Sequence, residues 1–165
     1  MDIFISTVII GIGATALTDI WSIARKSVFN IPPPDFGLVG RWIAHMPHGK
    51  FRHEAISRSP PVRGERMIGW TAHYLIGITF AGLLVALYDR SWLQEPTLLP
   101  ALIVGIATVA APFLIMQPGM GAGIAASRTP NPTKARIHSM IMHGVFGSGL
   151  YLAGCCALSL HQMRI

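Results

Sequence analysis

Residues 97–117 read TLLPALIVGIATVAAPFLIMQ, a run of 21 residues without a charged side chain. In an α-helix, about 20 such residues cross the ~30 Å hydrocarbon core of a bilayer. Runs of similar length and character occupy residues 3–24, 68–88 and 137–160. Each run predicts a helix, because lipid offers the backbone no hydrogen-bond partner and the runs lack the alternation of barrel strands. The sequence therefore predicts an all-α fold, an integral membrane bundle of four transmembrane helices.

The composition agrees with this fold and excludes several classes of protein. Charged residues make up only 12% of the chain, which is about half of their usual share in soluble domains. The two cysteines, Cys155 and Cys156, are adjacent, which excludes a disulfide framework and a zinc site built on cysteine. The formal net charge is +6, but the basic residues lie mostly between the apolar runs. They therefore indicate membrane topology, and no nucleic-acid partner is expected.

The distribution of Lys and Arg predicts the orientation in the membrane, because these residues are retained on the cytoplasmic side. The first connection between apolar runs contains eight of them and the third contains three, whereas the second contains only Arg90. We therefore expect the first and third connections to be cytoplasmic and both termini periplasmic, in a bacterial inner membrane. The first run contains Asp19 and precedes Arg25 and Lys26, so it predicts a retained helix and not a cleaved signal peptide.

The long cytoplasmic first connection, residues 25–67, is too rich in large apolar residues to be a simple linker. Asp35 can cap a short amphipathic helix in which Phe36, Val39 and Ile43 share one side. We expect this helix to lie in the headgroup region, with the basic residues of the connection near anionic lipid headgroups. The alternative is that it covers the cytoplasmic mouth of the bundle.

Small residues and prolines predict how the helices pack and bend. Glycines on the first, second and fourth runs form small faces that are expected to meet; they are Gly11, Gly69, Gly77 and Gly147. Pro112 and Pro118 lie in the cytoplasmic half of the third run. Because proline lacks an N–H and crowds the preceding turn, we expect a kink or break near Pro112.

Ionisable side chains lie at one depth of the predicted bundle. Asp19, His73 and His143 are each five or six residues from the cytoplasmic ends of their runs, about 7–9 Å inside the membrane. Gln117 and Met116 reach the same level on the third run. Since ionisable groups at membrane depth usually face the interior and find partners, Asp19, His73, His143 and Gln117 predict a proton or cation site. The simpler alternative is that Asp19 only accepts hydrogen bonds that hold the helices together.

Two sets of residues are candidates for a metal site. His73 and His143 lie on different helices at equal depth and can ligate haem or a transition metal, and Met116 suits a soft ion such as Cu(I). The second set is in the first connection and consists of His45, His48 and His53. Spaced histidines in a basic loop are more often solvated than ligating.

Several long stretches of the chain are unusual enough to be specific. They read GRWIAHMPHGKFRHEAI (residues 40–56), GERMIGWTAHYLIG (64–77) and MQPGMGAGIAASRTPNP (116–132), and residues 138–154 form a further block. In these stretches the chain resembles a bacterial family of four-helix inner-membrane proteins catalogued only as a domain of unknown function. The resemblance covers almost all of residues 1–165 as a single domain. It implies a bacterial inner-membrane location and a four-helix span, but no activity and no catalytic residue.

Three functions remain open from the residues. The first is a small proton- or cation-coupled carrier in which Asp19 binds and releases the ion as the third helix rearranges. A homodimer is then expected, since four helices alone enclose little volume. The second is a haem- or metal-binding membrane redox protein or enzyme that uses His73 and His143, and the third is an accessory structural subunit. The sequence contains no recognisable pairing of a nucleophile with a base, so enzymatic activity stays undecided.

Overall fold

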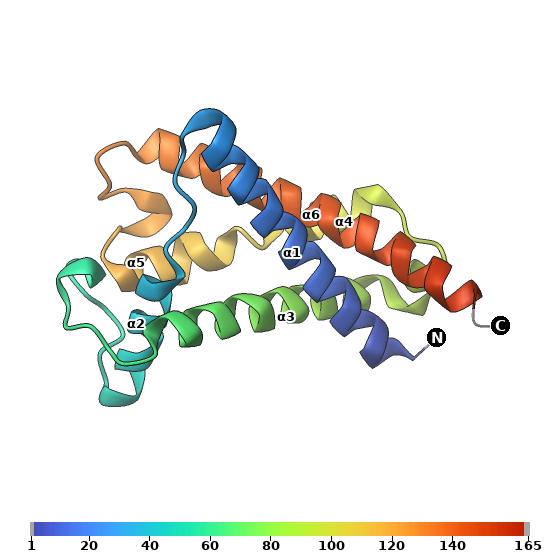
Figure 1. Cartoon of the computed structure of the whole chain (residues 1–165), viewed down its shortest axis with the longest axis horizontal. Helices are drawn as coiled ribbons and strands as arrows, with labels where there is room; N and C mark the ends of the chain where they lie inside the picture. The colour runs from blue at the N-terminus through green and yellow to red at the C-terminus, as the bar shows by residue number, and fades with distance from the viewer. Residues whose placement is uncertain (1, 164–165) are drawn as a thin grey trace. The chain divides into compact units, whose positions relative to one another are not determined.

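The computed structural model describes residues 2–163, which form helices joined by turns and loops (Figure 1). In chain order the α-helices are α1 (Ile3–Phe29), α2 (Phe36–His45), α3 (Glu65–Gln94), α4 (Leu98–Ala107), α5 (Gln117–Met120) and α6 (Pro132–Gln162). A π-helix over Pro112–Met116 precedes α5, and short 3₁₀ helices cover Met46–His48, Ile56–Arg58 and Ile124–Ala126. No β-strand occurs within residues 2–163, and the predicted all-α fold is confirmed.

Four segments of the described chain are long and apolar enough to cross a membrane: Ile3–Phe29, Glu65–Gln94, Leu98–Met120 and Pro132–Gln162. They coincide with the four predicted runs. Large apolar side chains remain exposed along them; Ile20, Leu87 and Ile115 are 61%, 61% and 64% exposed. Such surfaces are unfavourable in water but suit contact with lipid chains. The chain is therefore a membrane protein.

The predicted amphipathic helix of the first connection is α2. Asp35 has an extended backbone, and its carboxylate accepts a hydrogen bond from the Gly37 amide at 2.9 Å, as an N-cap does. The helix ends at His45 and runs into a 3₁₀ helix that Gly49 closes at φ +75°.

The third predicted span is interrupted. α4 ends at Ala107, and the chain passes through Thr108 and the π-helix Pro112–Met116 before α5 begins. Pro112 has no N–H to donate to the Thr108 carbonyl four residues earlier, so the α-helical ladder opens at Thr108. The interruption thus begins one turn before Pro112, and Gly121 at φ +95° ends α5.

The described residues group into two compact units. The first unit contains residues 2–33, 74–108 and 141–163, and the second contains residues 34–73 and 109–140. α3 and α6 contribute to both. The core of the first unit includes the almost fully buried side chains of Ile10, Leu84 and Leu150.

Glycines bring the helices of the first unit into backbone contact. A Cβ atom added to Gly11 of α1 would lie 2.5 Å from the Ile78 Cα of α3. Gly77 of α3 faces Thr15 of α1, and a Cβ atom on Gly147 of α6 would lie 2.9 Å from a backbone carbonyl oxygen of α4. Three of the predicted packing glycines therefore lie at helix crossings of this unit.

In the second unit, α2 lies across the first turns of α3 (Figure 1). Gly40 of α2 faces the Glu65 carbonyl, and Gly69 of α3, another predicted packing glycine, faces the Phe36 carbonyl. The Arg41 guanidinium donates to both carboxylate oxygens of Glu65, at 2.8 and 2.7 Å. This bidentate pair holds α2 on α3 and raises the pKa of Arg41 above its usual value.

The loop after α2 packs on the start of α5. The Trp42 indole lies against Gly119 and donates from Nε1 to the Phe51 carbonyl at 2.9 Å. The backbone amide of His53 donates to the Gly119 carbonyl at 2.9 Å. Residues of the first and third connections are therefore joined within the second unit.

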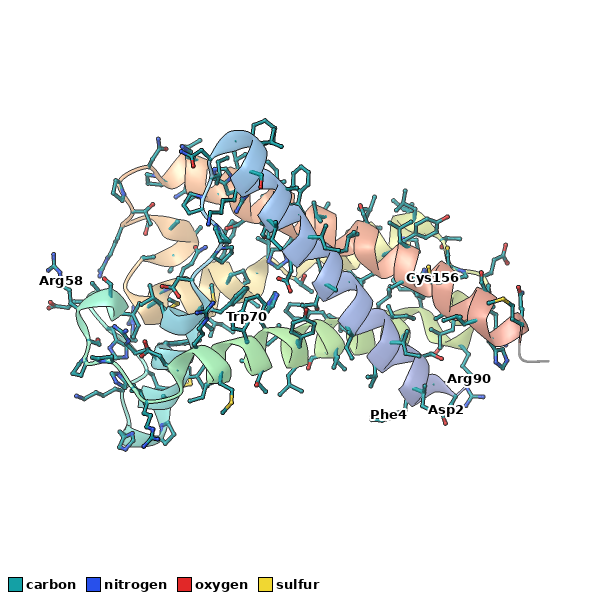
Figure 2. All side chains as sticks on the ribbon, viewed as in Figure 1. Asp2, Phe4, Arg58, Trp70, Arg90 and Cys156 are labelled. Carbon is teal, nitrogen blue, oxygen red and sulfur yellow. The ribbon has the colours of Figure 1, made fainter. Side chains whose placement is uncertain are left out.

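Charge is distributed unequally between the units. The second unit contains nine Lys and Arg residues against three Asp and Glu residues, whereas the described part of the first unit contains three against four. All nine basic residues except Arg41 are exposed. Arg58, for example, projects away from its 3₁₀ helix (Figure 2). The net positive charge of the chain is concentrated in the second unit.

Candidate functional site

A stripe of polar side chains is buried along α1 in the first unit. Thr15, Thr18 and Ser22 are 1%, 6% and 5% exposed. Each hydroxyl donates to the carbonyl oxygen four residues earlier, at 2.7, 2.9 and 3.0 Å, which satisfies it among apolar neighbours. Arg25 continues the same face and is only 6% exposed, with its guanidinium 3.5 Å from the Pro32 carbonyl oxygen.

Asp19 lies beside this stripe and is half-buried. Its Oδ2 accepts a hydrogen bond of 2.9 Å from the Tyr74 hydroxyl of α3. A phenol both donates and accepts hydrogen bonds, so Tyr74 links the acid to a neighbouring helix through a group that can also relay a proton. Tyr74 directly follows His73, the residue that the sequence places at the depth of Asp19.

His143 of α6 is bonded to α4 at the point where α4 is interrupted. Its Nδ1 lies 3.1 Å from the Gly105 carbonyl oxygen and 3.0 Å from Thr108 Oγ1, while the Thr108 hydroxyl donates to the Gly105 carbonyl at 2.6 Å. The Gly105 carbonyl oxygen can only accept a hydrogen bond, so His143 Nδ1 must carry the proton that is donated to it. In the neutral imidazole the lone pair is then at Nε2. The contacts with α4 therefore determine both the orientation and the tautomer of His143.

These groups lie at a common level of the first unit. Ser22 Oγ is 3.9 Å from Met142 Sδ, so α1 approaches α6 one turn from Asp19 and next to His143. Among the described hydrogen bonds, His143 is joined to α4 and not to Asp19. Three helices, α1, α3 and α6, and the C-cap residue of α4 thus contribute to one layer of polar side chains. This layer, named the polar layer below, consists of Asp19, Ser22, Tyr74, Thr108 and His143.

His73 belongs to the second unit. Its ring is stacked on Phe36 of α2, with the ring centroids 4.1 Å apart, and Trp70 meets it edge-on at 5.8 Å. The amphipathic helix of the first connection therefore covers this imidazole.

Gln117 and Met116 also belong to the second unit. Gln117 Nε2 lies 3.5 Å from the Ser139 hydroxyl, and its Oε1 is buried without a hydrogen-bond partner in the described structure. Met116 is the last residue of the π-helix. Of the residues of the predicted ion site, His73 and Gln117 are assigned to the second unit, and Asp19 and His143 to the first.

Two of the three histidines of the first connection lie together. The ring centroids of His45 and His53 are 5.1 Å apart, whereas His48 is exposed in the 3₁₀ helix after α2. Within residues 2–163, no group of three or more His, Cys, Asp or Glu side chains is arranged to hold a metal ion. The structure pairs His45 with His53 and does not assemble all three.

Two residues of the polar layer, Thr108 and Tyr74, and the burial of Arg25 were not expected from the sequence. Thr108 lies four residues before Pro112. A proline has no N–H to donate to the carbonyl at that position, so the spacing from Pro112 could have identified Thr108 in the sequence. Tyr74 lies at the depth of His73 and is recognisable only by that depth. Arg25 is buried. Its place directly after an apolar run is typical of the exposed basic residues that determine membrane orientation, so the sequence does not indicate this burial.

Comparisons with known proteins identify a family. A family model described as a protein of unknown function (DUF2938) matches residues 8–157, a range that contains the whole polar layer. No curated protein and no solved structure matches the chain. The description of the family names no activity.

Proposed function

The chain belongs to the DUF2938 family of proteins of unknown function, and we propose that it is a small proton- or cation-coupled carrier whose site is the polar layer. The main support is the hydrogen bond between Asp19 and Tyr74, which joins two helices that are apolar enough to span a membrane. A carboxylate inside a span is costly, and such residues usually mark ion or proton pathways.

The members of the polar layer have complementary roles in this proposal. Asp19 takes up the proton or cation, because it is the acid of the layer. The Tyr74 hydroxyl relays a proton, and His143 accepts one at Nε2 while Nδ1 stays bonded to α4. The interruption of α4 at Thr108 supplies the movable element, since π-helical and broken segments are common where membrane helices rearrange around a site. A homodimer completes the proposal, because four helices enclose little volume.

Reconstitution in liposomes tests the carrier. With a pH-sensitive dye inside and the membrane potential clamped by K⁺ and valinomycin, we expect an imposed pH gradient to collapse faster in vesicles that contain the protein than in empty ones. Na⁺ and K⁺ uptake are measured on vesicles of the same preparation without valinomycin, because valinomycin itself carries K⁺. Rates equal to those of empty vesicles for all three ions would contradict the carrier.

His143 also supports a second function, a haem- or metal-binding redox protein. A ligating histidine usually donates its other ring nitrogen to an oxygen, as His143 Nδ1 does to the Gly105 carbonyl. A haem absorption band or stoichiometric iron in the purified protein, lost in His143→Phe, would favour this function over the carrier.

We also propose a bacterial inner membrane, with the first and third connections on the cytoplasmic side and both termini periplasmic. The concentration of exposed Lys and Arg in the second unit supports this orientation. The same side chains suit anionic lipid headgroups, which are a proposed partner of the first connection.

Cysteine labelling tests the orientation in a background without Cys155 and Cys156. Arg58→Cys is expected to react with a membrane-impermeant maleimide only after the inner membrane is opened, because exposed Arg58 belongs to the basic unit. Asp2→Cys is expected to react in intact spheroplasts. The reverse pattern would contradict the proposed topology.

A further inference from the structure

Two neighbouring imidazoles in the second unit each have a buried ring nitrogen that lacks a hydrogen-bond partner in the described part of the chain. His45 Nδ1 and His53 Nε2 are both buried and accept or donate no hydrogen bond within the described residues. The two rings have centroids 5.1 Å apart and planes inclined by 35°. Buried polar atoms are normally satisfied, and stacking of the rings does not satisfy either nitrogen. A single ligand able to bond two imidazoles would satisfy both.

The surroundings prepare the two histidines as ligands. His53 Nδ1 lies 2.9 Å from Ser59 Oγ, and when it donates this bond the lone pair of the neutral ring is at Nε2. An oxygen partner on the second nitrogen is typical of metal-ligating histidines. His45 is the last residue of α2, where the negative end of the helix dipole favours a cation.

The separation of the rings fits binding of one ion by both. With metal–nitrogen bonds of about 2.1 Å and a tetrahedral angle between them, two ligating imidazoles have centroids roughly 5 Å apart. The centroids of His45 and His53 are 5.1 Å apart. The spacing of the two rings is therefore compatible with both of them binding one ion.

We propose that His45 and His53 bind a divalent transition-metal ion of the zinc class. Two imidazoles suit zinc and its neighbours copper and nickel, and not magnesium or calcium, which prefer oxygen ligands. Within residues 2–163 no third His, Cys, Asp or Glu side chain completes the set, so the proposal assigns the remaining coordination positions to water. The site is distinct from the polar layer, whose residues belong to the first unit, and from His48, which is exposed.

Metal titration of the full-length protein in detergent tests this site. The protein is purified without a histidine tag, treated with a chelator and titrated with Zn²⁺ against a chromophoric competitor. We expect one ion per chain for the wild type and for His48→Ala, the matched control from the same segment. His45→Gln and His53→Gln are expected to bind at least about tenfold more weakly, and Ser59→Ala severalfold more weakly.

A spectroscopic readout separates ligation from a packing role. Cu²⁺ bound to the wild type is expected to show hyperfine splitting from two nitrogens, and each glutamine variant is expected to lose one. Circular dichroism and thermal unfolding establish which variants are folded. The loss of nitrogen splitting is judged only in the folded variants. Unchanged Zn²⁺ affinity in both folded glutamine variants, or a wild type that does not compete with the chelator, would overturn the proposal.

Discussion

Gly147→Leu is expected to force α6 away from α4 and to destabilise the protein by about 3 kcal/mol. A Cβ atom at this position would lie 2.9 Å from the Ala101 carbonyl oxygen and 3.0 Å from the Leu102 Cα. Both are backbone atoms of α4, which cannot rotate out of the way as a side chain can. Thermal unfolding in detergent measures the effect, and for a chain of this length the melting temperature should fall by roughly 6–12 °C.

Gly144→Leu is the matched control, with the same substitution one turn earlier on the same helix. A Cβ atom at Gly144 would meet no atom within 4 Å. The expected change in stability is therefore within roughly 0.5 kcal/mol. Equal losses in the two variants would mean that leucine disturbs α6 in general and that the close approach to α4 is not what matters.

Asp19→Asn is expected to abolish ion flux while leaving the protein folded. Asparagine retains the size of the side chain and can still accept the hydrogen bond from Tyr74, so a purely structural role predicts nearly normal stability. It cannot ionise, so a proton or cation site is lost. In the liposome assay we expect the rate above that of empty vesicles to fall at least about tenfold, with the melting temperature measured in parallel.

Asp2→Asn is the control for Asp19→Asn, because it makes the same charge change on the same helix outside the polar layer. Asp2 caps α1 by accepting a hydrogen bond from the Ile5 amide, and asparagine caps equally well. It is therefore expected to leave flux unchanged. Wild-type flux in Asp19→Asn would reduce the carboxylate to a packing contact and would end the carrier proposal.

The candidate site is only partly predictable from sequence. Counting residues from the end of an apolar run gives the depth of Asp19 and His143, because rise per residue is constant in a helix. Depth does not give the direction in which a side chain points around the helix axis. The structure shows Tyr74 as a hydrogen-bond partner of Asp19 and Thr108 as a partner of His143, and depth alone names neither of them.

Arg25 illustrates the same limit. A basic residue after an apolar run is usually exposed near the headgroups, but Arg25 continues the buried face of Thr18 and Ser22. Its burial depends on which face of α1 is covered by its neighbours, and composition and spacing do not report that.

The sequence by itself determined the number of spans, the all-α class, the position of α2 and the glycines of the helix crossings. These features follow from local rules: lipid requires backbone groups to bond within their own helix, Asp35 caps the helix that follows it, and small residues permit close approach. Only the tertiary structure decided that α2 covers His73, that His45 lies against His53 and that His143 is held by α4. Those contacts join residues far apart in the chain, and they depend on the rotation and crossing of packed helices.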